Sequence, residues 1–75
     1  MTPAREYKRV LGEVDTIVKR LPMVVNEHAA RQVRTPQYWS HTADLRKARL
    51  DLLHTLAFLG DLEARETLLA EGEAR

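Results

Sequence analysis

Residues 52–62 constrain the fold of this chain most strongly, because apolar side chains occur there on nearly every side of a predicted helix. The apolar residues of this segment are Leu52, Leu53, Leu56, Ala57, Phe58, Leu59 and Leu62. An α-helix that is apolar all round has to be covered on several sides. A chain of 75 residues without cysteine can build only a small core and has no disulfide to reinforce it. We therefore expect a second copy of the chain to cover part of this segment.

A long amphipathic helix is predicted over residues 3–33. Thr2 suits an N-cap and Pro3 suits the first helical position. Apolar residues then recur at helical spacing and fit a heptad repeat. One heptad set comprises Tyr7, Val14, Leu21 and His28, and the other comprises Leu11, Val18, Val25 and Gln32. Pro22 removes one backbone hydrogen bond. Because the apolar phase passes through Pro22 unbroken, we favour one helix kinked there over two short helices.

The second half of the chain begins with Thr35-Pro36, which repeats the Thr-Pro start signal and places a turn over residues 34–41. A helix follows over residues 42–59. Gly60 and Asp61 leave two alternatives open. Either they cap one helix and start a short third one over residues 61–71, or the second helix continues through Gly60 at a cost of about 1 kcal/mol.

The expected fold is all-α, with residues 1–75 forming a single domain in which the two long helices make an antiparallel hairpin. Two such hairpins related by a two-fold axis give a four-helix bundle with a shared core. We assign to this core and dimer interface the residues Val14, Leu21, Leu52, Leu53, Leu56, Leu59 and Leu62.

A cluster of basic and aromatic residues is the candidate site for a foreign partner. This basic-aromatic cluster comprises Arg31, Arg34, Tyr38, Trp39, Arg46, Lys47 and Arg49. Aromatic and arginine side chains are enriched at binding hot spots. Two simpler explanations compete: Arg at a helix C-terminus complements the helix dipole, and Trp39 can plug the end of a bundle. Residues 28–50 carry a local charge of +4 and residues 51–75 a local charge of −4, within a net charge of +1.

Several functional classes lack their sequence signatures. The chain has no glycine-rich phosphate loop and no nucleophile motif, so we expect no enzyme and no cofactor. His28, His41 and His54 lack metal-binding spacing and are expected in a core or interface. Neither a membrane span nor a signal peptide is recognisable, which favours a cytoplasmic protein.

In size and expected architecture the chain resembles the small helical inhibitors and anti-activators coded by phages and plasmids. This resemblance implies a homodimer that inhibits or adapts a larger bacterial regulator or machine by covering its surface. One alternative is a nucleic-acid-associated regulator that uses the basic-aromatic cluster, although a net charge of +1 gives little long-range attraction to phosphate. The other alternative is a structural subunit of a larger assembly.

Overall fold

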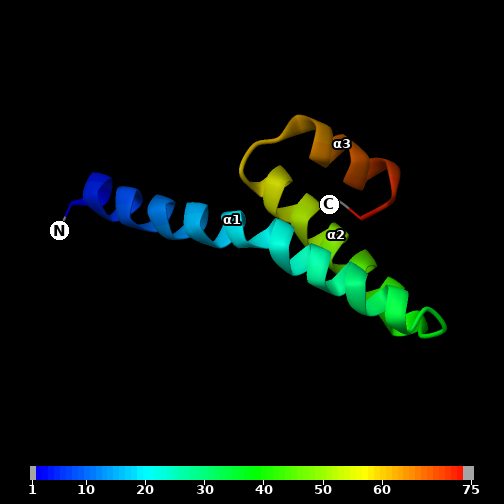
Figure 1. Ribbon diagram of the computed structural model, residues 1–75. Coiled ribbons are helices and arrows are strands. Elements are labelled where there is room, and N and C mark those ends of the chain that lie inside the picture. Colours follow the sequence, from blue (N-terminus) through cyan, green and yellow to red (C-terminus); the bar gives the residue numbers. More distant parts are fainter. Residues whose placement is uncertain (1, 74–75) are drawn as a thin grey trace. The chain divides into compact units, whose positions relative to one another are not determined.

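The computed structural model describes residues 2–73, and within them the chain is all-helical, with three α-helices and no strand. The helices are α1 (Pro3–Arg34), α2 (Trp39–Phe58) and α3 (Leu62–Ala70) (Figure 1). The chain divides into two compact units, Met1–Pro36 and Gln37–Arg75, and each unit is described by itself. The antiparallel hairpin of the two long helices and its dimerisation stay predictions.

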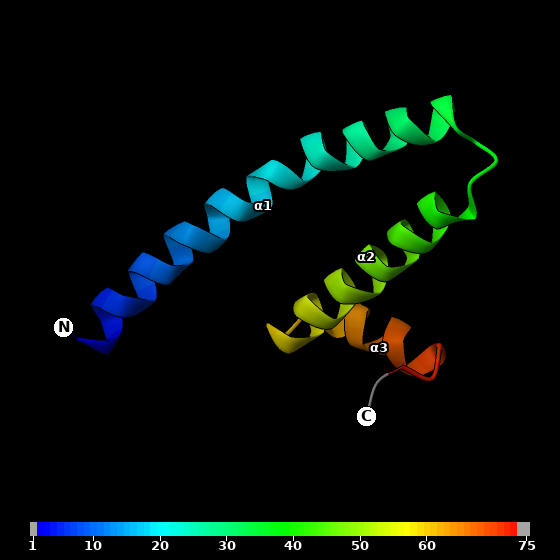
Figure 2. The same cartoon turned by 90° about the horizontal axis from the view of Figure 1, so that it is seen from below.

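The first unit consists of α1, which is one continuous helix of 32 residues with Pro22 inside it (Figure 2). The Thr2 side chain caps its start by accepting a hydrogen bond from the backbone N–H of Arg5 at 3.2 Å. Thr35 closes the other end, because its N–H and its hydroxyl both donate to the carbonyl of Arg31, at 3.1 Å and 3.0 Å. Thr35 thus ends α1, and α2 begins at Trp39, three residues before the predicted start.

The second unit contains α2 and α3, which are separated by a turn at Gly60. Gly60 has a φ of 110°, a left-handed conformation that glycine adopts without a steric penalty. Its N–H donates to the carbonyl of Ala57, and the N–H of Asp61 donates to the carbonyl of Leu56, at 3.1 Å and 2.9 Å. These two bonds form a Schellman motif that satisfies the last carbonyls of α2. Of the two alternatives left open by the sequence, the structure has the capped one.

Asp61 also starts α3, because its carboxylate accepts a hydrogen bond from the N–H of Ala64 at 2.9 Å. At the far end, Gly72 has a φ of 74° and repeats the Schellman geometry: its N–H donates to the carbonyl of Leu69, and the N–H of Glu73 donates to that of Leu68. A helix of nine residues is too short to be stable alone in water. Its stability therefore has to come from packing on α2.

The packing of α3 on α2 supplies the buried residues of the described chain. Ala64 and Leu68 are 3% and 1% exposed, and they are the only two residues buried within residues 2–73. They lie four residues apart and so share one face of α3. On α2, Leu50, Leu53 and Ala57 are half-buried. One side of α2 is thus covered by its own chain, while Leu52, Leu56 and Leu59 remain exposed.

Candidate interaction surfaces

The apolar stripe of α1 is the first candidate surface. No residue of α1 is buried, and the structure describes this helix over its whole length. Apart from the half-buried Leu21, its large apolar side chains are exposed, among them Tyr7, Leu11, Val14, Ile17 and Val18. Helices in proteins gain most of their stability from packing an apolar face, not from intrinsic propensity. The stripe is therefore a surface that requires a partner.

A second apolar surface, here called the turn patch, consists of Phe58, Leu59 and Leu62. These side chains are 89%, 72% and 71% exposed. Phe58 is the last residue of α2, Leu59 is its C-cap and Leu62 is the first residue of α3, so the Schellman turn brings them close together in the chain. Neighbouring large apolar side chains that remain in water commonly mark a binding surface.

The residues predicted for the core and dimer interface divide into two groups in the structure. Leu21 and Leu53 are half-buried. The others are exposed in the single chain, namely Val14, Leu52, Leu56, Leu59 and Leu62. Their place in a dimer stays a prediction. Sequence reasoning missed Ala64 and Leu68, although their spacing of four residues would have indicated a shared helical face.

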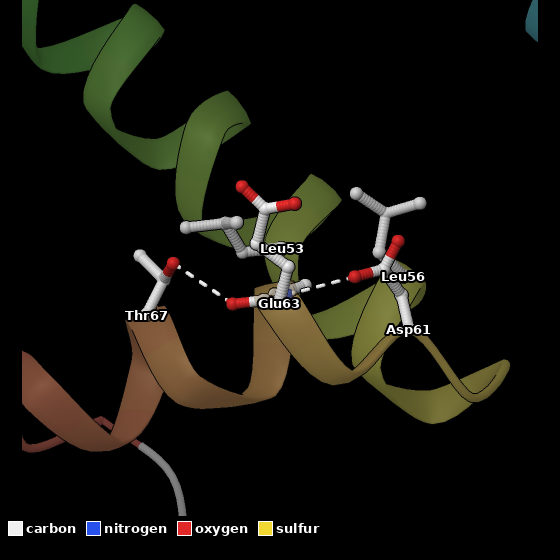
Figure 3. Close-up of a pocket in the computed structure, with 6 residues that line it drawn as sticks. Leu53, Leu56, Asp61, Glu63 and Thr67 are labelled. Atoms are coloured by element: carbon white, nitrogen blue, oxygen red, sulfur yellow. Dashed lines mark hydrogen bonds between the residues drawn. The ribbon is translucent and has the colours of Figure 1, made fainter.

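A shallow pocket of about 200 Å³ lies where α3 packs on α2. Leu53 and Leu56 of α2 line it together with Asp61, Glu63, Ala64 and Thr67 (Figure 3). Small-molecule sites in proteins usually occupy about 300–1,000 Å³. The polar groups here also serve the helix itself, since the Asp61 carboxylate caps α3 and the Thr67 hydroxyl donates to the carbonyl of Glu63 at 2.9 Å. The pocket is therefore a small gap in the packing of two helices.

The basic-aromatic cluster is distributed over both units. Arg31 and Arg34 lie in the last turn of α1, where positive charge complements the helix dipole. Tyr38 is the N-cap of α2 and Trp39 is its first residue. Trp39 is 81% exposed, and the Tyr38 ring lies 6.3 Å from the ring of His41. Each unit thus presents part of the cluster to solvent.

Two cations of the cluster are paired with carboxylates inside the second unit. Lys47 Nζ lies 2.6 Å from the Asp51 carboxylate, one turn further along α2. Arg49 donates two hydrogen bonds to the Glu71 carboxylate, at 3.0 Å and 2.6 Å. The Arg49 hydrogen bonds lower the pKa of Glu71, and the same pair raises the pKa of Arg49. Arg46 is exposed.

The Arg49–Glu71 pair connects the basic middle of the sequence to its acidic C-terminal third. Arg49 lies in the middle of α2 and Glu71 is the C-cap of α3, so the pair holds the end of α3 against α2. Because both side chains are exposed, we expect it to orient α3 more than to stabilise it. The assignment of Arg49 to partner binding stays a prediction, and the structure adds an intramolecular contact that the sequence did not indicate.

Among residues 2–73, no group of three His, Asp or Glu side chains lies close enough together to hold a metal ion. No helix in this same range is both long enough and apolar enough to cross a membrane. No protein-family model, curated protein or solved structure matches the chain.

Proposed function

We propose that this chain is a small homodimeric protein-binding module that acts in the cytoplasm. Its apolar helical surfaces serve association, first with a second copy and then with a larger protein. By covering part of that larger protein, a bacterial regulator or machine, the module acts as an inhibitor, anti-activator or adaptor.

The observation that carries this proposal is the scarcity of buried residues. Ala64 and Leu68 alone are buried in the described chain, while the large apolar side chains of α1 and the turn patch remain in water. Soluble monomers rarely keep contiguous apolar surfaces of this kind exposed. Small domains that lack disulfides commonly reach stability by oligomerisation.

Nucleic acid is a less suitable partner for the basic-aromatic cluster. Lys47 and Arg49 are each paired with a carboxylate of the second unit. A phosphate backbone would therefore have to compete with Asp51 and Glu71. Nucleic-acid affinity depends on the number of phosphates that cations neutralise, and this pairing reduces that number. A protein surface that uses Trp39 and Arg46 fits the same cluster without that competition.

Self-association is tested by light scattering and by the concentration dependence of thermal unfolding. The wild-type chain is expected to be a dimer with a melting temperature that rises with concentration. Leu56→Asp is expected to give an unfolded or aggregated chain. Leu59→Asp spares the fold better, because Leu59 is mostly exposed in one chain, and should yield a helical monomer. Ala43→Asp adds the same charge at the exposed start of α2 and should remain dimeric. A wild-type chain that stays monomeric at every concentration tested would contradict the dimer.

Binding to a larger protein is tested by affinity capture from a cell lysate with and without nuclease. The bait chains are the wild type and the double variant Trp39→Ala/Arg46→Ala. The proposal predicts that a protein is captured by the wild type after nuclease treatment and is lost with the double variant, while the melting temperature is unchanged. A lowered melting temperature would show that Trp39 supports the fold. Capture that disappears with nuclease would favour a nucleic-acid-associated regulator.

A further inference from the structure

The apolar stripe of α1 is too long for the other long helix to cover. At ~1.5 Å per residue the 32 residues of α1 span about 48 Å, whereas the 20 residues of α2 span about 30 Å. Only residues 35–38 connect the two helices, so any lengthwise packing would limit the reach of α2 to the C-terminal part of α1. The apolar side chains near the N-terminus, Tyr7, Leu11 and Val14, therefore require cover from another chain.

The charges beside this part of the stripe are self-complementary. Lys8 and Asp15 each follow a residue of one heptad set, Tyr7 and Val14, by a single position. They consequently lie on the same edge of the stripe, one heptad apart. In an antiparallel pair of identical helices, an edge faces the same edge of the other copy. If Leu11 packs against Val14 of the second copy, Lys8 faces Asp15 of that copy, and the two-fold axis generates this contact twice.

The same charges disfavour the neighbouring alignments. A shift of one heptad in one direction places Lys8 opposite Lys8 of the second copy. The opposite shift places Asp15 opposite Asp15. Like charges facing each other across an interface are destabilising and exclude wrong registers. The other edge of the stripe carries Val10 and Ile17, which widen the apolar contact and favour no competing register.

The Asp15 carboxylate has room for this second cation. Within its own helix Asp15 lies 2.8 Å from Lys19 Nζ, and its side chain is still more than half exposed. A carboxylate has two oxygens that accept several hydrogen bonds, so one carboxylate can pair with Lys19 and with Lys8 of another chain.

We infer that the N-terminal half of α1 binds the same segment of a second copy in an antiparallel pair centred between Gly12 and Glu13. Leu11 packs against Val14 of the second copy, and two Lys8–Asp15 pairs fix the register. This inference rests on the homodimer of the proposed function and adds to it a defined surface and alignment.

A mixing experiment with two single variants tests this pairing. Homodimers of Lys8→Glu place the introduced carboxylate against Asp15, and homodimers of Asp15→Lys place the introduced ammonium group against Lys8, so both are repelled. In a heterodimer of the two variants, both contacts join opposite charges. One contact joins the two native residues, Lys8 and Asp15. The other joins the two introduced residues, whose charges are exchanged relative to the native pair. Native mass spectrometry of an equimolar mixture, with one chain isotopically labelled, should show about four-fifths or more heterodimer, against about half for random exchange.

The controls separate this pairing from dimerisation itself. Lys19 lies on the face of α1 away from the stripe, so Lys19→Glu mixed with labelled wild type should give the random proportion. Each variant chain occurs both in its homodimer and in the heterodimer. The effect of a substitution on its own helix therefore cancels from the proportion of heterodimer. A random proportion for the Lys8→Glu and Asp15→Lys mixture, with a dimeric wild type, overturns the α1 pairing and leaves the homodimer intact. A wild type that is monomeric at every concentration tested overturns both.

Discussion

Replacement of Leu68 by alanine tests whether the packing of α3 on α2 is the core of the second unit. The Leu68 side chain is the most completely buried of the described residues. Leu→Ala changes in protein cores cost about 2–5 kcal/mol, the transfer free energy of the lost atoms plus a cavity term. Because only two helices enclose this site, neighbouring side chains can collapse into the space. We therefore expect a loss of about 2–3 kcal/mol in the free energy of unfolding.

This loss is large for so small a chain. A 75-residue domain is expected to be stable by about 4–11 kcal/mol in total. The measurement is urea unfolding followed by circular dichroism at one fixed chain concentration, so that any change in self-association is held constant. The urea concentration at the unfolding midpoint should fall, while the slope of the free energy of unfolding against urea concentration stays nearly the same.

The neighbouring residue provides a matched control. Leu69→Ala changes the same side chain in the same helix, but Leu69 is exposed in the single chain. Its cost should be clearly smaller than that of Leu68→Ala, since surface substitutions usually change stability by about 0.5 kcal/mol or less. Equal shifts for the two variants would refute the assignment of Leu68 to the buried face of α3.

Four further changes test the helix propensity, the capping and the charges of the fold by the same unfolding measurement. Gly12→Ala should stabilise α1 by about 1 kcal/mol, because a methyl group there meets open space and Ala is the better helix former. Gly60→Ala should instead destabilise the fold, because the φ of 110° at this position strains an L-residue even though the added methyl group meets open space. Asp61→Ala should cost about 1 kcal/mol through loss of the α3 N-cap, and an unchanged midpoint would contradict that role. Arg49 holds the pKa of Glu71 below its ordinary value of 4.5. The free energy of unfolding of the wild type should therefore exceed that of Glu71→Gln fully above pH 4.5, and this difference should vanish as the pH falls through the lowered pKa. A difference that persists in acid would contradict the pair.

Local rules were sufficient to predict the helices of this chain. The Thr2 cap, Pro3 and the unbroken apolar phase indicated one helix through Pro22, and the structure has it. Gly60 and Asp61 indicated a capped break as one of two alternatives, and the structure has that as well. These features depend on residues within five positions of each other, where spacing alone determines which backbone groups and side chains meet.

The role of Thr35 was less well predicted, because this residue can act in two ways. Its hydroxyl is able to cap the start of a following helix or to bond back to the preceding turn. The sequence favoured the first, whereas in the structure Thr35 donates to the carbonyl of Arg31 and closes α1. The two uses have the same local signature, so the residues alone did not distinguish them.

The sequence by itself determined that this chain is helical and that one helix runs through Pro22, and it left the break at Gly60 as one of two alternatives. Only the tertiary structure decided which residues the chain does bury. The return of α3 along α2 places Leu68 in the core and brings Glu71 to Arg49, 22 positions earlier in the chain. A contact across that separation depends on the direction in which a turn sends the chain and on which helical faces then meet. Neither the direction of the turn nor the choice of helical faces that meet follows from the spacing of residues within a single helix.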